Sequence, residues 1–152
     1  METVDEIIIH CSATKEGQDF RANDIRSWHR QRGFADIGYH AVVCIDGKIE
    51  RGRDYTMVGA HCTQQRKNYT SIGICYVGGL DAKKKPCDTR NEKQKEALYM
   101  LISALCRKYK IKRVRGHRDY AAKACPCFDA AAEYQCIADK YEALREIRSE
   151  TK

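Results

Sequence analysis

The sequence has no long apolar run. No stretch approaches the roughly 20 apolar residues that a membrane-spanning helix needs, so we expect no membrane insertion. The first ten residues, METVDEIIIH, are acidic where a secretory signal is basic, and their apolar run is too short for a signal core. These features predict a protein that is cytoplasmic after synthesis and carries no signal peptide.

The sequence also lacks internal repeats, low-complexity segments and linkers. A length of 152 residues suits one core, so we expect a single domain over residues 1–152 in which binding and chemistry share one fold. The net charge of +7 favours an anionic partner. The aromatic and basic motifs of the common nucleic-acid-binding modules are missing, so we expect no nucleic acid.

The nine cysteines are an odd number with irregular spacing, which is not typical of a secreted disulfide framework. Reduced thiols explain them more simply. Cys44 and Cys75 lie among strand-like apolar residues, and Cys106 and Cys136 lie on apolar helical stretches, so we expect all four in the core. Cys87 lies in the polar segment KKKPCD, and we expect its thiol to be exposed.

Strand and helix patterns alternate along the chain. Apolar, β-branched runs predict strands at residues 4–12, 71–79 and 112–119, and the Asp46-Gly47 pair predicts a hairpin between two further strands. Helical periodicity covers residues 23–34, 91–110 and 129–148, and the last of these helices should pack on the core. The pattern predicts an α/β fold with a central mixed sheet flanked by helices.

Two of the five histidines, His10 and His117, lie at the ends of predicted strands, where sites gather in open α/β sheets. Cys125 follows His117 in a loop. Two imidazoles and one thiolate leave one position of a tetrahedral zinc ion open, as a hydrolytic site requires. By spacing alone a structural, hydrogen-bonded role is the more common one for histidines at strand ends, because a His-x7-Cys pair is no standard zinc motif.

Four strings carry a more specific signal: IIIHCSAT, WHRQRGFADIGYH, SIGICYVGG and GHRDYAAKACPCFD. In order and spacing they resemble the amidase-2 family of N-acetylmuramoyl-L-alanine amidases, which includes the lysozymes of T-odd coliphages and has the peptidoglycan recognition proteins as more distant relatives. The resemblance runs from about Glu6 to Asp129. Four ordered motifs are much harder to obtain by chance than any one of them.

The resemblance implies a peptidoglycan hydrolase that cleaves the lactyl amide between N-acetylmuramic acid and L-alanine with one Zn²⁺ per chain. The family's metal ligands fall on His10, His117 and Cys125. Cys127 departs from the serine of the phage enzymes. As a second thiol it could compete for zinc or form a disulfide on oxidation, but we expect it to have no role in the site.

The resemblance also implies two catalytic residues and one substrate-binding residue. The tyrosine of the family's GYH motif falls on Tyr39, and the lysine two positions before the cysteine ligand falls on Lys123. One residue would stabilise the oxyanion and the other would assist proton transfer, and the two roles could exchange. His61, in the string GAHC, corresponds to a residue of the substrate cleft.

Two other classes of function stay open. A cysteine hydrolase would use Cys125 as nucleophile and His117 as base. A wall-recognition module would bind peptidoglycan without cleaving it, although non-catalytic relatives lose the cysteine ligand that this chain keeps. An endolysin of a phage or prophage, acting as a monomer on the bacterial cell wall, fits the sequence best, and a bacterial wall-remodelling enzyme would look similar.

Overall fold

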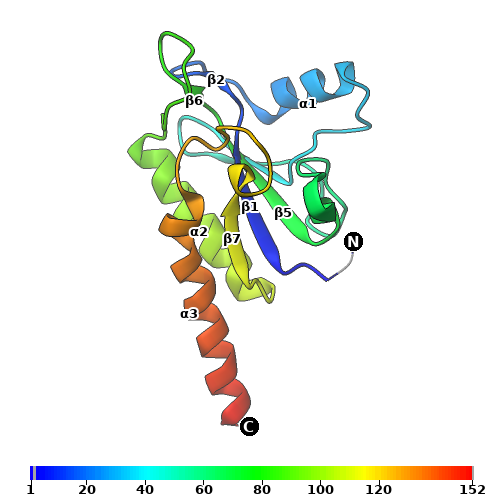
Figure 1. Cartoon of the computed structure of the whole chain (residues 1–152), viewed down its shortest axis with the longest axis vertical. Helices are drawn as coiled ribbons and strands as arrows, with labels where there is room; N and C mark the ends of the chain where they lie inside the picture. The colour runs from blue at the N-terminus through cyan, green and yellow to red at the C-terminus, as the bar shows by residue number, and fades with distance from the viewer. Residues whose placement is uncertain (2, 152) are drawn as a thin grey trace.

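A five-stranded mixed sheet forms the centre of the molecule in the computed structural model, which describes residue 1 and residues 3–151 (Figure 1). The strand order is β4-β3-β5-β1-β7. Strands β1, β3, β5 and β7 are parallel and β4 runs antiparallel at one edge. The bounds are β1 (Glu6–Cys11), β3 (Ala41–Val43), β4 (Ile49–Arg51), β5 (Ser71–Tyr76) and β7 (Arg113–Gly116). The expected α/β fold with a mixed sheet is confirmed.

The central strands are buried on both faces. All six residues of β1 and all six of β5 are buried, which explains their unbroken apolar runs. At the edge, β3 and β4 form the expected hairpin around Asp46 and Gly47. Gly47 has φ +84°, a conformation that favours glycine in a tight turn.

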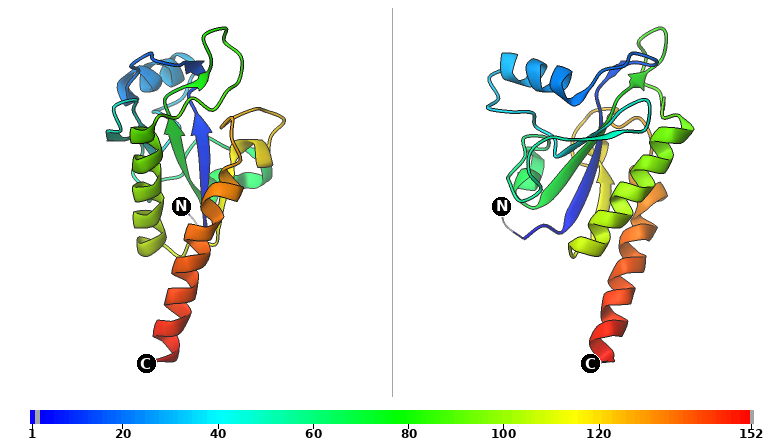
Figure 2. Two further views of the ribbon diagram at one scale, coloured as in Figure 1. Left: turned by 90° about the vertical axis from the view of Figure 1, so that its left-hand side faces the viewer. Right: turned by 180° about the vertical axis from the view of Figure 1, so that it is seen from behind.

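Two helices lie along the sheet, and a third lies near the carboxyl ends of its strands (Figure 2). Helices α2 (Glu92–Lys108) and α3 (Ala130–Glu150) pack against one face, in a core that contains Ile72 and Ile74 of β5. Helix α1 (Ala22–Gln31) packs in a separate core with Cys75, whose side chain points to the other face of β5. The three helices confirm the predicted helical segments.

Helix α3 packs along only part of its length. Tyr134, Ile137 and Ala138 are buried, but Leu144 is 39% exposed and the last turns extend beyond the sheet (Figures 1 and 2). The expectation that the whole helix packs is therefore wrong for its C-terminal turns, because α2 and the sheet end before α3 does.

The cysteines follow the expected pattern with one exception. Cys44, Cys75 and Cys106 are buried and Cys87 is exposed. Cys136 is exposed, so its assignment to the core is wrong. It directly precedes the buried Ile137, and a step of one residue turns a helical side chain about 100° away from the core face.

Several short elements have no signal in the sequence. They are β2 (Thr14–Lys15), β6 (Gly79–Leu80) and the 3₁₀ turns η1 (Gln64–Tyr69) and η2 (His117–Asp119). Strands of two residues are too short to show alternation. Among the described helices, none combines the length and apolar character needed to cross a bilayer.

Arg90 links the loop before α2 to the first turn of α3. Its side chain is 2% exposed, with 2.9 Å and 2.7 Å ion pairs to Asp88 and Glu133, and its guanidinium lies 3.4 Å from the ring centroid of Phe128. Replacing Arg90 with methionine leaves both carboxylates without their partner. Because these carboxylates are partly exposed, we expect a loss of about 3 kcal/mol, the lower end for a broken buried ion pair, measurable by urea denaturation.

Arg51 provides the matched control for this stability prediction. Its ion pair with Asp54 is 3.8 Å long, and both side chains are more than half exposed. Arg51→Met should therefore change the free energy of unfolding by less than about 1 kcal/mol. Equal losses in the two variants would contradict the structural role of Arg90.

Candidate metal centre

The site lies where the parallel strands β1 and β7 end. Ile9 of β1 is in register with Gly116 of β7, so His10 and His117, the next residues, come out at the same edge of the sheet. The carboxyl ends of parallel strands are the usual position of ligand sites in α/β folds. The pairing of two distant segments thus brings both histidines together.

A loop then carries Cys125 over this edge. The backbone N–H of Arg118 donates to the Cys125 carbonyl (2.7 Å), and the Tyr76 hydroxyl donates to the Pro126 carbonyl (2.7 Å). Gly116 allows the close approach, because a Cβ at this position would lie 2.7 Å from Pro126 Cδ. The loop is therefore fixed on both sides of the thiol.

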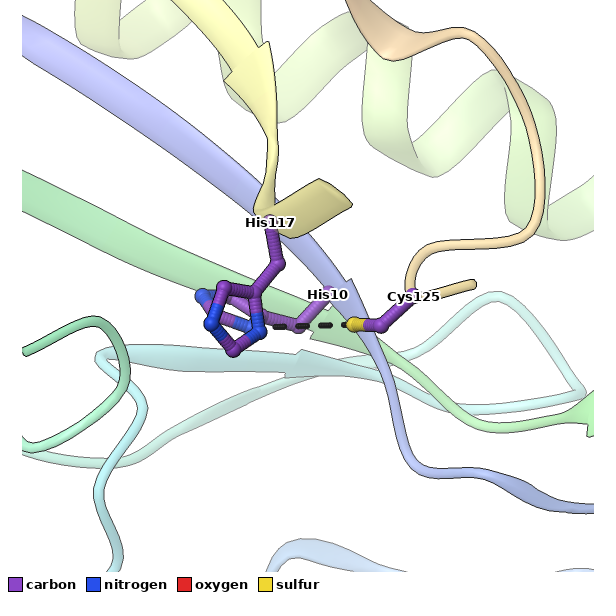
Figure 3. Close-up of side chains that lie close together, drawn as sticks. All are labelled: His10, His117 and Cys125. Carbon is purple, nitrogen blue, oxygen red and sulfur yellow. Dashed lines mark hydrogen bonds between the residues drawn. The ribbon is translucent and has the colours of Figure 1, made fainter. Parts of the chain in front are cut away.

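The donor atoms of His10, His117 and Cys125 converge (Figure 3). All three lie within 4.8 Å of one another, and Cys125 Sγ is 3.8 Å from His10 Nδ1. A tetrahedral zinc with ordinary Zn–N and Zn–S bonds would place these two atoms about 3.6 Å apart. Two nitrogens and one sulfur fit zinc by chemistry and by spacing, and three protein ligands leave a fourth position for water or substrate.

Burial keeps the two histidines in the form that binds metal. The pKa of His10 is lowered well below its ordinary value, mainly by desolvation and then by the nearby imidazoles of His61 and His117. The pKa of His117 is lowered by desolvation and by the ammonium of Lys123. Neutral imidazoles leave a nitrogen lone pair available for a metal ion.

A cavity of about 300 Å³ opens beside these three convergent donor groups. Tyr39 and Lys123 line it together with Trp28 and Arg32, and none of the described lining residues is Asp or Glu. With two cationic side chains and no carboxylate in its walls, the cavity favours an anionic substrate or a developing negative charge.

The family comparison agrees with this geometry. The model of the Amidase_2 family, described as N-acetylmuramoyl-L-alanine amidase, matches residues 1–128. The chain belongs to the Amidase_2 family. It is therefore an N-acetylmuramoyl-L-alanine amidase, and the resemblance of its four motifs to this family is confirmed.

Individual relatives support the same assignment. The endolysin of Escherichia phage T7 is 42% identical over 128 residues, which are 84% of this chain and 83% of the relative. Peptidoglycan-recognition protein SC2 of Drosophila melanogaster is 31% identical over 77% of this chain and 61% of the relative. The solved structure of the amidase LysC from Clostridium intestinale has a TM-score of 0.74 at 28% identity, covering 91% of this chain and 85% of that one.

The structure of this amidase brings both candidate catalytic residues to the cavity. The ring centroids of Tyr39 and His10 are 5.1 Å apart. Burial raises the pKa of the Tyr39 phenol well above its ordinary value, so the group keeps its proton at neutral pH. Lys123 is exposed in the loop before Cys125. Their catalytic roles stay predictions.

His61 lies behind His10 and has little exposed surface. It borders the cavity, but it is only 8% exposed, and its Nδ1 is 2.8 Å from His10 Nε2. A direct substrate contact through His61 stays a prediction. Two further neighbours have no signal in the sequence: Gln64 Oε1 lies 3.4 Å from His117 Nε2, and Ser71 Oγ lies 3.3 Å from His61 Nε2.

The two cysteines nearest the ligands stay outside the metal group. The backbone N–H of Cys11 donates to Cys125 Sγ (3.3 Å), an outer hydrogen bond of the kind that orients metal ligands, while the Cys11 side chain lies in the core. Cys127 Sγ donates to the carbonyl of Gly79 (3.3 Å). Neither thiol belongs to the convergent set of donors.

Proposed function

We propose that this amidase is zinc-dependent, holds one ion per chain through His10, His117 and Cys125, and cleaves the lactyl amide between N-acetylmuramic acid and L-alanine of peptidoglycan. The convergence of these three donors at the end of β1 and β7 supports the proposal. When bound, zinc polarises a carbonyl and lowers the pKa of water, which supplies a nucleophile at neutral pH.

The chain's own residues supply the rest of the chemistry. The Lys123 ammonium lies in the cavity wall, where it stabilises the oxyanion that forms when the amide carbonyl is attacked. The Tyr39 phenol keeps its proton in its buried setting and donates a hydrogen bond or a proton on the same side of the cavity as His10. Trp28 and Phe34 form an apolar part of the cavity wall that excludes water.

The biological role follows from the relatives. The endolysins of phages T7 and KP32 are 42% and 43% identical to this chain. We propose that this amidase is likewise an endolysin, which waits in the cytoplasm and degrades the bacterial cell wall after release. It acts as a monomer over residues 1–152, and it needs no nucleic acid and no membrane insertion.

One contact would also suit a cysteine hydrolase. Cys125 Sγ lies 3.8 Å from His10 Nδ1, so His10, rather than the His117 that the sequence suggested, would be the base of such a pair. A thiol and one imidazole would suffice for that chemistry. The convergence of a second imidazole, from His117, favours the metal site.

Product analysis tests which bond is cut. Purified peptidoglycan is incubated with the amidase, and new amino termini and new reducing sugar ends are both quantified. We expect free N-terminal L-alanine to appear without any rise in reducing ends. Reducing ends without amino termini would identify a glycosidase, and neither product would identify a binding protein; both results would contradict the proposal.

A further inference from the structure

Behind the metal ligand His10, a chain of hydrogen bonds leads from His61 to Ser71 and then to the carbonyl of Lys67. We propose that His61 is a positioning residue that fixes the tautomer and the ring orientation of His10, so that His10 Nδ1 faces the metal position. This inference rests on the proposed zinc site for its functional meaning, but the hydrogen bonds that support it are present in the protein itself.

The direction of each hydrogen bond follows from the end of the chain. The Lys67 carbonyl can only accept, so the single hydroxyl hydrogen of Ser71 is donated to it (2.5 Å). Ser71 Oγ must therefore accept a hydrogen bond from His61 Nε2 (3.3 Å). This contact places the hydrogen of the His61 imidazole on Nε2 and leaves Nδ1 with a lone pair.

The lone pair on His61 Nδ1 then determines the state of His10. The His61 ring is buried and its hydrogen-bond partners are an imidazole and a hydroxyl, with no carboxylate to pair a buried cation, so the ring is neutral and Nδ1 is an acceptor. His10 Nε2 lies 2.8 Å from this acceptor and must donate to it. A neutral His10 with hydrogen on Nε2 has its free lone pair on Nδ1, the atom 3.8 Å from Cys125 Sγ.

The surroundings of His61 hold its ring in this place. The backbone N–H of His61 donates to the Asn68 side-chain oxygen (2.8 Å). Gly73 and Gly59 leave room for the ring, because a Cβ at Gly73 would lie 2.5 Å from His61 Cγ and a Cβ at Gly59 would lie 2.7 Å from Cδ2. The imidazole is thus confined by backbone on two sides.

The same contacts separate a positioning role from substrate binding. Both ring nitrogens of His61 are already engaged, one with His10 and one with Ser71. No polar ring atom is left for a substrate group. Metal-bound histidines are typically oriented by a hydrogen bond from their second ring nitrogen, and loss of that outer partner typically lowers metal affinity about 10–100-fold.

The first test is zinc affinity, measured by competition with a chromophoric chelator. His61→Leu removes the acceptor, and we expect its zinc affinity to fall about 10–100-fold. His61→Asn keeps an oxygen acceptor near the position of Nδ1, and we expect it to recover most of the affinity. Equal zinc affinity in wild type and His61→Leu would overturn the inference.

His40 provides a matched control. It is a fully buried histidine whose ring contacts the Met57 carbonyl and the Gly73 N–H, and it lies edge-on to the His61 ring at a centroid distance of 5.8 Å without being one of the three convergent donors. His40→Leu should lower thermal stability and leave zinc affinity close to wild type. A loss of affinity equal to that of His61→Leu would mean that any buried histidine in this region gives the effect, and would also overturn the inference.

A second readout needs neither zinc nor variants. In the zinc-free wild-type protein, ¹⁵N NMR of the imidazoles should show His10 with its hydrogen on Nε2 and His61 unprotonated at Nδ1. The opposite tautomer of His10 would overturn the inference even if His61→Leu failed to fold. Absence of zinc binding in wild type, with the expected tautomers present, would instead contradict the proposed function alone.

Discussion

Cys125→Ser is expected to abolish both stoichiometric zinc binding and amidase activity. The thiolate is one of three convergent donors, and a serine hydroxyl is a much weaker ligand for zinc than a thiolate. Loss of a direct ligand should lower zinc affinity by more than the roughly 10–100-fold that loss of an outer partner costs. Metal analysis after gel filtration, together with the release of N-terminal L-alanine, measures both effects.

Cys127→Ser is the matched control, two residues along the same loop. Its thiol contacts the Gly79 carbonyl and lies outside the convergent donors. We therefore expect zinc content and activity to stay at the wild-type level. If Cys125→Ser kept its zinc but lost activity, the thiol would be a nucleophile rather than a ligand, and the metal site would need revision.

Lys123→Met is expected to lower kcat by about 10²–10³-fold, the usual effect of removing one group that stabilises an oxyanion. Zinc content should not change, because the Lys123 side chain supplies no ligand atom to the convergent group. Lys123→Met should therefore lose activity and keep its zinc, whereas Cys125→Ser should lose both. Steady-state kinetics on a soluble muramyl-peptide substrate, with metal analysis of the same preparation, provides the measurement.

Lys83→Met controls for the loss of one positive charge. Lys83 is exposed in the loop after β6 and does not line the cavity. The Lys83→Met variant should keep the wild-type kcat and change at most the binding to the polymeric wall. An equal loss of kcat in both lysine variants would show that net charge, rather than an ammonium beside the metal position, explains the effect.

Much of the fold and the convergence of the two strand-end histidines could be predicted because the decisive features are local. The apolar run of β1 and the position of His10 at its end can be read directly from the sequence, as can His117 at the end of β7. Parallel pairing then brings the two strand ends together. Cys125 was assigned from the resemblance of its loop to a known family, since spacing alone does not connect it to His10.

The outer contacts of the site could not be predicted in the same way. The arrangement of His61 against His10 depends on Ser71 and on the space left by Gly73, which come from different segments of the chain. Periodicity also predicts burial wrongly where it continues past the core, as in the last turns of α3 and at Cys136. Such features depend on tertiary packing, which a one-dimensional pattern does not contain.

Metal removal and restoration tests the central claim most directly. The purified amidase is analysed for zinc, stripped with a chelator, assayed on peptidoglycan, and assayed again after zinc is added back. The account predicts about one zinc per chain, loss of L-alanine release in the stripped protein, and recovery with zinc. Full activity in the metal-free protein would contradict it and would point to Cys125 as a nucleophile.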